Sequence, residues 1–576
     1  MTTDKCTNVI EKCIDLKGSE NCDDANMVDI SISKDVLVIG AGSFGLEAAG
    51  KIAAQGYSVS VIGVKTACAR QSGCSSEMLE TGKVNIMQDV AIDSLAGVTG
   101  DFRAVLIKTA GNGTGCNETG CSEKVEKVFG AIVVAPQYSY SPLNKKYGLT
   151  LNDKVVSQSQ FEAMLGDSES QKKILNSNNG NGSTVAFLTG FAQEGDPTLT
   201  SRVLTSALAV QNMENCNAYI YAGNVKVGAK GLERLFTQGR HAGVVCFKPS
   251  QMPTIEQTST VEQDGNCDHK QVSETIKITI KDPVVRTDVE LTPDYIVVEE
   301  ALVVGQQNLD IASTLRIDAD LYGFLPSNNV HRFPAKSNRD GIFVVNNSAD
   351  AANTALKLKE LIGNGIKKVA ANKAKVDEDR CVICLTCYRS CPHGAIFWQN
   401  GAAAISQVAC QGCGICASEC PMDAIQIGDF TDDSLRTSIK DAVVSAKDNQ
   451  KDGQPLIVAF CCKNSAFEAC EAATQFGHEM PQGFRMVKVP CAGKVDVEFI
   501  MKAFVEGADG VMVAACHEGN CKAERGNIYA KWRVNEIQKR LEKMGLEKNR
   551  LIFTTIASNM AKEFAGKVNA FAAAIQ

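Results

Sequence analysis

Short apolar runs alternate with amphipathic stretches near both ends of the chain. Residues 35–40 (DVLVIG) and 57–63 (YSVSVIG) have the apolar character of buried strands, and residues 46–56 between them have the spacing of an amphipathic helix. The last part of the chain repeats this alternation, with strands predicted at 455–460, 484–490, 509–515 and 551–557 and helices at 495–508 and 530–545. Strands that alternate with helices form parallel sheets covered by helices. The sequence therefore predicts a multidomain α/β protein with a strand–helix–strand unit near its start and a small parallel α/β domain at its end.

The composition is that of a globular protein with a mild negative charge. Of the 576 residues, 44% are hydrophobic and 22% are charged, and 59 Lys and Arg against 66 Asp and Glu give a net charge of -7. This charge provides no overall attraction to nucleic acid or to an anionic membrane. The chain has no run of about 18 uncharged apolar residues, and its first residues lack the pattern of a signal peptide. We expect a cytoplasmic protein that neither binds nucleic acid nor spans a membrane.

Cysteine is the unusual residue in this composition. The chain has 24 cysteines, and 14 of them fall within residues 381–576. In a large chain without an export signal, clustered cysteines indicate metal sites or clusters rather than disulfides. Residues 381–392 read CVICLTCYRSCP and residues 410–421 read CQGCGICASECP. Both follow C-x2-C-x2-C-x3-C-P, the run of bacterial ferredoxins that bind [4Fe–4S] clusters.

The spacing within each run predicts how two cubic clusters share the ligands. Three thiolates on a tight loop can ligate three irons of one cube, and the fourth cysteine points at the other cube. One cube is therefore assigned to Cys381, Cys384, Cys387 and Cys420, and the other to Cys391, Cys410, Cys413 and Cys416. The alternative is a pair of structural zinc sites, but zinc loops normally carry two cysteines each. Two cubes in one module lie close enough for electrons to hop between them, so the segment is predicted to be an electron path.

A glycine-rich loop joins the first predicted strand to the first helix. The pattern is G-x-G-x-x-G in the strand–turn–helix context of a dinucleotide-binding loop, where a pyrophosphate meets the helix N-terminus. The predicted cofactor contacts are Gly40, Gly42, Ser43, Phe44 and Gly45. The acid expected at the end of the next strand is absent, since residues 62–65 read IGVK. A Rossmann-like scaffold without a nucleotide is therefore the alternative. Residues 184–190 predict a further strand, but no glycine fingerprint follows it, which argues against an NAD site there.

Four cysteines of the last domain stand at the ends of predicted strands. Cys462, Cys491 and Cys516 follow three strands, and Cys521 follows Cys516 in a C-x4-C step. The carboxyl edge of an open α/β sheet is where ligands bind, so the four thiolates are predicted to converge there and to suit a [2Fe–2S] cluster. Cys461 in place of Cys462 is an alternative ligand. A set of structural or zinc-bound cysteines is the alternative for the whole group.

The order of these segments resembles a known fusion. The segments that carry the resemblance are VLVIGAGSFGLEAA (36–49), NVKVGAKGLERLFTQGRHAGVVCFK (224–248), CQGCGICASECPMDAIQI (410–427) and PCAGKVDVEFIMKAFVEGADGVMVAACHEGNC (490–521). They resemble the heterodisulfide reductase A family fused to the delta (iron–sulfur) subunit of methyl-viologen-reducing hydrogenase. The same fusion occurs in the B component of the quinone-interacting membrane-bound oxidoreductase.

The resemblance implies a division of the chain and a set of cofactors. It implies an N-terminal arm (1–34), a flavin-binding Rossmann-like domain (35–375), a two-cluster ferredoxin domain (376–430), a linker helix (431–453) and a hydrogenase-delta-like α/β domain (454–576). It further implies FAD in the first domain, two [4Fe–4S] clusters and one [2Fe–2S] cluster. The partners would be other redox subunits of a hetero-oligomeric complex, including a membrane-anchored, quinone-linked subunit that holds the chain at the inner face of the membrane.

Several positions depart from the family pattern. Residues 200–205 lack the cysteines of a cluster-binding segment, and Asn346 and Asn347 stand where small residues are expected near FAD. These departures indicate a reduced member that is closer to the quinone-linked type than to the bifurcating archaeal one. Four further cysteines could hold an additional cluster or could be loose thiols left from a lost site: Cys68, Cys74, Cys116 and Cys121.

The function predicted from these features is electron relay within a multi-subunit oxidoreductase. A flavin can accept an electron pair and release single electrons, which the clusters then carry. No nucleophile or acid–base pair stands out, as expected for a relay whose substrates are other redox proteins. Two alternatives remain, a stand-alone flavin-dependent NAD(P)H:acceptor oxidoreductase and a flavin-free cluster wire on a docking scaffold.

Overall fold

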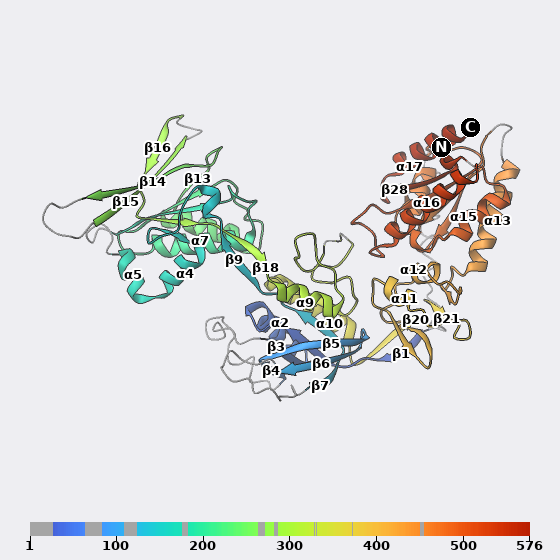
Figure 1. Cartoon of the computed structure of the whole chain (residues 1–576), viewed down its shortest axis with the longest axis horizontal. Coiled ribbons are helices and arrows are strands. Elements are labelled where there is room, and N and C mark those ends of the chain that lie inside the picture. Colours follow the sequence, from blue (N-terminus) through green and yellow to red (C-terminus); the bar gives the residue numbers. More distant parts are fainter. Residues whose placement is uncertain are drawn as a thin grey trace, which may run out of the picture. The chain divides into compact units, whose positions relative to one another are not determined.

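The chain folds into two compact units (Figure 1). A computed structural model describes residues 27–63, 83–108, 124–175, 182–262, 271–281, 286–327, 329, 331–370, 373–449, 454–545 and 547–576. One unit comprises Met1–Gln137 and Gln306–Gln576, and the other comprises Tyr138–Gly305. Within the described residues, no helix is both long enough and apolar enough to cross a membrane.

The first unit begins with a parallel five-stranded sheet in the order β19-β8-β2-β3-β4. Its strands are β2 (Asp35–Ile39), β3 (Ser58–Gly63), β4 (Val84–Gln88), β8 (Ala131–Val134) and β19 (Ile342–Val344), and the helices α2 (Ser43–Ala54) and α10 (Ser348–Ile362) pack together beside it. The apolar run predicted as the first strand is fully buried, with Val36, Leu37 and Val38 at 0% exposure. Helix α2 begins three residues before the predicted start, because Gly42 in extended conformation already acts as its N-cap.

An antiparallel sheet and a helix complete this Rossmann domain. The sheet consists of β5 (Val90–Val98), β6 (Asp101–Lys108) and β7 (Lys124–Phe129), and α9 (Gln306–Leu315) packs on β5. A doubly wound parallel sheet with an antiparallel meander is the FAD/NAD(P)-type arrangement. The polar arm expected over residues 1–34 contains a strand, β1 (Met27–Ser31), that pairs with β20 (Ile366–Ala370). The sequence pattern missed β1 because its side chains are mostly exposed and its partner lies far away in the chain.

The second unit is another parallel sheet, in the order β10-β17-β11-β12-β13. Its elements are β10 (Val155–Ser157), β11 (Thr184–Thr189), β12 (Asn217–Ala222), β13 (Val245–Phe247) and β17 (Tyr295–Val298), with α4 (Gln158–Gly166), α5 (Ser168–Leu175), α7 (Pro197–Gln211) and α8 (Leu232–Ala242). An antiparallel sheet of β14 (Thr254–Glu262), β15 (Gln271–Lys281) and β16 (Asp288–Leu291) and a pair of β9 (Tyr138–Pro142) with β18 (Glu300–Val304) complete it. Residues 35–375 therefore contain two Rossmann-like sheets rather than one. The second was not recognised because β11 lacks the glycine fingerprint.

The ferredoxin segment in the first unit shows its internal repeat as two short hairpin-like pairs and two short helices. The strands are β21 (Lys375–Val376) with β24 (Ile425–Gln426) and β22 (Ile396–Gln399) with β23 (Ala402–Ile405), and the helices are α11 (Thr386–Ser390) and α12 (Ile415–Ser418). Each helix carries the third cysteine of its run, and the fourth cysteine follows the helix. The structure therefore reproduces the strand positions expected after each Cys-Pro pair.

The C-terminal part of the first unit is a parallel four-stranded sheet in the order β26-β25-β27-β28. Its strands are β25 (Ile457–Cys462), β26 (Phe484–Val489), β27 (Gly510–Ala515) and β28 (Leu551–Thr555), and its helices are α13 (Asp432–Asn449), α14 (Ala466–Gln475), α15 (Val497–Glu506), α16 (Gly526–Lys543) and α17 (Ala561–Ile575). Side chains of α13, α15 and α16 fill one core with the sheet, and side chains of α14 and α17 fill another. The helix predicted over 431–453 thus packs as α13 in the core of this domain.

Candidate iron–sulfur and flavin sites

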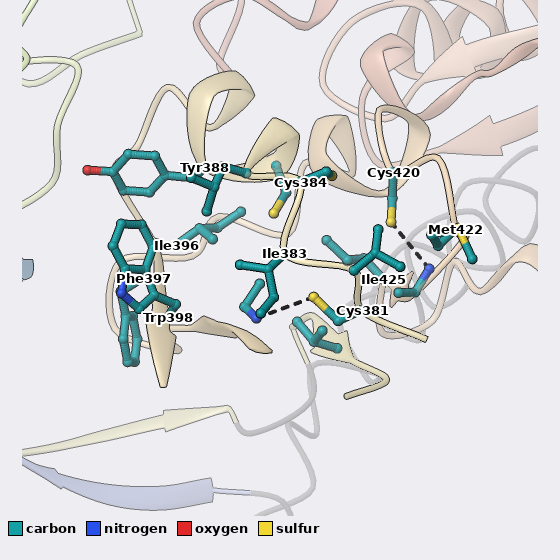
Figure 2. A pocket seen from close by; sticks show the side chains of 16 residues that line it. Cys381, Ile383, Cys384, Tyr388, Ile396, Phe397, Trp398, Cys420, Met422 and Ile425 are labelled. Carbon is teal, nitrogen blue, oxygen red and sulfur yellow. Dashed lines mark hydrogen bonds between the residues drawn. The ribbon is translucent and has the colours of Figure 1, made fainter. Parts of the chain in front are cut away.

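Four of the predicted ligands surround one cavity of the ferredoxin segment. Cys381, Cys384, Cys387 and Cys420, the first thiol set, line a space of about 510 Å³. Three of them come from the first run and Cys420 comes from the second, in the combination that the crossing pattern predicts. Figure 2 shows Cys381, Cys384 and Cys420 around this space together with apolar side chains such as Ile425. The loop can wrap around the cavity because Ile383 and Leu385 adopt positive φ angles of 53° and 60°.

The other four ligands of the ferredoxin segment surround a second cavity. Cys391, Cys410, Cys413 and Cys416, the second thiol set, line a space of about 340 Å³. Here Cys391 is the member that comes from the other run. Burial raises the pKa of Cys413 to about 12 and also raises that of Cys391, so these groups stay protonated unless a positive charge enters the cavity. Iron ions supply such a charge and deprotonate the thiols that bind them.

The thiol sets enclose spaces and do not converge on single points. Among the described residues, no group of three or more His, Cys, Asp or Glu side chains has the geometry to hold one metal ion. A polynuclear cluster requires a wider separation of its thiolates than a zinc ion does. The donor sets therefore fit clusters better than the zinc sites considered as the alternative.

A third group of thiols lies at the carboxyl edge of the C-terminal sheet. Cys462, Cys491, Cys516 and Cys521, the C-terminal thiol set, are each at most 3% exposed and pack against one another. The Sγ atoms of Cys462 and Cys516 are 3.8 Å apart. Cys462 is the last residue of β25, and Cys461 before it points into the core on the other face of the sheet. Because side chains alternate along a strand, only one of these two neighbours can join the set, and the structure places Cys462 there.

The C-terminal thiol set has little room for added atoms. Hydrogen bonds from the thiols of Cys462 and Cys521 lower the pKa of Cys516, which gives one sulfur of the set thiolate character. A Cβ atom added at Gly526, the first residue of α16, would lie 2.2 Å from Cys491 Sγ. Gly526 is therefore required for the present position of the Cys491 thiol. No local sequence pattern marks Gly526, since its role depends on a loop that is distant in the chain.

The second thiol set and the C-terminal thiol set adjoin each other. Cys413 packs directly against the C-terminal thiol set. Added Cβ atoms show how closely the two backbones approach: one at Gly414 would lie 2.7 Å from Lys494 Cβ, and one at Gly493 would lie 2.7 Å from Ile415 Cγ1. These glycines let the ferredoxin loop and the loop after β26 come into contact.

Polar contacts hold this junction together. The Arg533 guanidinium donates to the carbonyl oxygens of Gly493 and Val495, at 2.9 and 2.6 Å, and pairs with Glu419 at 2.6 Å. Lys494, whose side chain is 1% exposed, forms an ion pair with Asp432 at the start of α13. The sequence did not single out Lys494 or Arg533, because a lone basic residue carries no pattern that distinguishes a buried pair from a solvated charge.

The flavin candidate is a cavity at the carboxyl ends of β2, β3 and β8. It encloses about 940 Å³ and is lined by Gly40, Gly63, Ala135 and Gln137, among others. The chain order reverses between β2 and β8, and such a switch point is where open α/β sheets bind ligands. A Cβ at Gly40 would lie 2.2 Å from the Ala135 carbonyl oxygen, so glycine is required at this turn.

The N-terminus of α2 is open to an anion. Gly42, its N-cap, makes no side-chain capping bond, and the first turn carries no acidic residue. A Cβ at Gly42 would have only the Gln137 amide as a near neighbour, at 3.5 Å. Free N–H groups in this position fit a pyrophosphate. Of the predicted contacts, Gly40 lines the cavity, Ser43 opens the helix and Gly45 packs against Gly40, whereas Phe44 packs on the hydrophobic core.

Two other features of the Rossmann domain fit a flavin less well. The end of β3 brings Gly63, which has no carboxylate, into the cavity. At α10 the Asn347 side chain accepts a hydrogen bond from the Asp350 amide, and the Asp350 carboxylate accepts one from the Asn346 amide. Helix α10 thus satisfies its own N-terminus, unlike α2. The further cysteines Cys68, Cys74, Cys116 and Cys121 lie outside the described residues.

In the second unit, a carboxylate of the chain occupies the loop after β11. Glu299 accepts hydrogen bonds from the amides of Gly190 and Ala192, at 2.9 and 3.0 Å, and from the Tyr147 hydroxyl. Burial and the Glu299 charge together raise the pKa of Tyr147. The N-terminus of α7 is likewise capped by Asp196. Amides that could face a nucleotide phosphate in this sheet are therefore already bonded to carboxylates.

Fold and thiol sets together define one component of an oxidoreductase, with an FAD-binding fold and iron–sulfur domains. Residues 373–471 match the 4Fe-4S dicluster domain, and residues 457–576 match the family described as methyl-viologen-reducing hydrogenase, delta subunit. The chain is 33% identical over 122 residues to the vhu iron-sulfur (D) component of the F420-non-reducing hydrogenase of Methanocaldococcus jannaschii, which covers 21% of this chain and 91% of the relative. Through this C-terminal domain the chain belongs to the hydrogenase delta-subunit family.

The part of the chain that precedes this domain has another relative. The chain is 25% identical over 223 residues to the A component of the ferredoxin:CoB-CoM heterodisulfide reductase of Methanosarcina mazei, which covers 39% of this chain and 28% of the relative. The chain is thus heterodisulfide-reductase-A-like, but it spans little more than a quarter of that relative's length. Thioredoxin reductase of T. acidophilum superposes with a TM-score of 0.33 at 13% identity, over 57% of this chain and 99% of the reductase. The fold assignment rests on the strand order and not on this weak likeness.

Proposed function

We propose that this chain relays electrons between redox partner subunits of a larger oxidoreductase. The observation that carries the proposal is the contact between thiol sets, because Cys413 of the second set packs against the C-terminal set. The first and second sets already share crossing ligands within one ferredoxin segment. The chain therefore offers three adjoining cofactor positions in a row.

The residues assign a cofactor to each position. The first and second thiol sets would each hold a [4Fe–4S] cluster, and the C-terminal thiol set would hold a [2Fe–2S] cluster. FAD would lie in the cavity beside Gly40, with its pyrophosphate at the N-terminus of α2. When bound, FAD exchanges electron pairs and the clusters exchange single electrons. The chain's own contribution is to hold these groups close together and to exclude water, as the burial of Cys413, Cys416 and Cys491 indicates.

The partners are proposed from the relatives and from one exposed end of the row. The printed names of the relatives describe components of a hydrogenase and of a heterodisulfide reductase, which are both redox complexes. Beside the first thiol set, Cys384 is exposed, and Val382, Ile383 and Trp398 are 58%, 49% and 58% exposed. An exposed apolar surface next to an exposed ligand gives a partner's cofactor a route to this end. The proposed partners include a membrane-anchored, quinone-linked protein, as the family resemblance implies.

Two alternatives differ in how well the structure supports them. An NAD(P)H:acceptor oxidoreductase needs a second nucleotide site, and Glu299 occupies the amides where its phosphates would bind. A flavin-free cluster wire is favoured by the self-capped α10 and by Gly63 in place of an acid. The flavin content of the protein distinguishes this second candidate from the main proposal.

The deciding experiment is an analysis of iron, sulfide and flavin in anaerobically purified protein, with EPR after dithionite reduction. The proposal expects about ten irons and one FAD per chain, since two cubes and one binuclear centre contain that many irons. About ten irons without flavin would support the flavin-free wire. About eight irons without a [2Fe–2S] signal would refute the assignment of the C-terminal thiol set.

A further inference from the structure

The internal repeat of the ferredoxin segment differs at one position beside each crossing cysteine. The first run continues Cys391-Pro392-His393, and the second continues Cys420-Pro421-Met422. Met422 lines the cavity of the first thiol set, and His393 lines the cavity of the second. An imidazole therefore stands at one cavity where the repeat has a thioether at the other.

His393 carries a buried nitrogen without a partner. Its side chain is 6% exposed, and its Nε2 atom has no hydrogen-bond partner among the described residues. Burial lowers the pKa of His393 to about 4, so the ring is neutral at pH 7 and has one N–H. A buried polar group that stays unpaired costs about 1–3 kcal/mol. A partner is therefore expected in the adjoining space, which is the cavity of the second thiol set.

The surrounding backbone fixes the turn that contains His393. The Asn338 side-chain amide donates to the Pro392 carbonyl oxygen at 3.3 Å. On the other side of His393, a Cβ at Gly394 would lie 2.8 Å from Arg339 Nε, which shows how closely this turn packs on the Arg339 side chain. The ring therefore cannot turn out to solvent without moving these contacts. Met422 in the equivalent position is 41% exposed and has no such enclosure.

We propose that His393 donates a hydrogen bond from Nε2–H to a sulfur of the cluster held by the second thiol set, and that this bond raises the reduction potential of that cluster above that of its neighbour. The inference rests on the proposed function, because it needs both cubes to be present. Hydrogen bonds to cluster sulfur stabilise the reduced, more negative state and are among the factors that set cluster potentials. One electron enters the cluster on reduction, and the N–H bond of His393 stays intact. The higher potential would draw electrons from the first cube toward the C-terminal thiol set.

The direct test needs no variant. Wild-type protein labelled with 15N-histidine and reduced with dithionite is examined by pulsed EPR. We expect one weakly coupled imidazole nitrogen on one of the two reduced cubes. Two cube signals with about eight irons in the segment but no histidine coupling would overturn the inference and leave the proposed function intact. Absence of the cubes themselves would instead overturn the proposed function.

Variants then test the effect on the potential. H393M reproduces the repeat partner, keeps a side chain of similar size and removes the donor, so it should abolish the coupling and lower the potential of that cube. H393Q keeps a neutral N–H donor and should recover part of the shift. M422L is the matched control at the equivalent position and should leave the coupling and the potential of the second cube unchanged. An H393M protein with full iron content and an unchanged potential would also overturn the inference.

Discussion

Gly526→Ala is a sharp test of the C-terminal thiol set, because it isolates the position of one sulfur atom. Gly526 is the first residue of α16 and does not have a positive φ, so its backbone accepts alanine without strain. Alanine is also the better helix former, by about 1 kcal/mol. Any loss in this variant must therefore come from what the added methyl group meets. It meets Cys491 Sγ at 2.2 Å.

The size of the required movement decides the expected result. Ordinary van der Waals contact begins near 3.4 Å, so the sulfur would have to retreat by roughly 1 Å or more. Metal–ligand distances tolerate only about 0.2 Å of deviation. Cys491 therefore cannot keep its place as a ligand, and its neighbours Cys462 and Cys521 cannot compensate from their fixed positions. We expect G526A to lose the [2Fe–2S] signal and about two irons while both cubes remain.

The assay is iron content together with EPR on anaerobic wild-type and variant protein. Gly566→Ala in α17 is the matched control, since a Cβ there would have no neighbour within 4 Å. It should keep the full iron content and be slightly more stable, because alanine replaces glycine within a helix. A G526A protein with an undiminished [2Fe–2S] signal would show that Cys491 is not a ligand.

Three further predictions concern other parts of the chain. Asp432→Asn should lower the stability of the junction by about 3–5 kcal/mol, since it leaves the buried Lys494 ammonium without its partner, and faster hydrogen exchange in α13 would report it, whereas the double variant with Lys494→Met should recover much of the loss. Burial acts to raise the pKa of Asp432, but the hydrogen bond from Lys494 keeps it below the usual value; the contribution of this pair should therefore persist above about pH 4 and disappear as the pH falls through the lower folded-state pKa, and a flat acid profile in wild-type protein would contradict this. Gly40→Ala, which drives a Cβ to 2.2 Å from the Ala135 carbonyl oxygen, should lose flavin and keep its iron, and unchanged absorbance of bound flavin would argue against the proposed cavity. Glu299→Ala should speed hydrogen exchange at the two amides after β11, and protection equal to wild type would show that Glu299 does not hold them.

Local sequence determined the elements and ligands that depend on short-range spacing. The two C-x2-C-x2-C-x3-C-P runs predicted which cysteine crosses to which set, because each run is one loop and one short helix whose geometry follows from neighbouring residues. Cys420 and Cys391 accordingly line the cavities of the opposite runs. The buried strands and their helices could be predicted for the same reason, since apolar periodicity over five or six residues reports one face of an element.

Only the tertiary structure decided how distant segments meet. The choice of Cys462 over Cys461 depends on which face of β25 meets the loops after β26 and β27, and both residues look alike in the sequence. The contact of Cys413 with the C-terminal thiol set joins segments that are far apart in the chain, and the second Rossmann-like sheet lacks the glycine signal that would announce it. His393 is visible in the sequence as a break in the repeat, but its burial and its unpaired Nε2 arise from packing against residues 338 and 339. The physical reason is the same in each case: spacing along the chain encodes contacts within one turn or one strand, whereas burial and the company of a side chain are set by elements that meet only after folding.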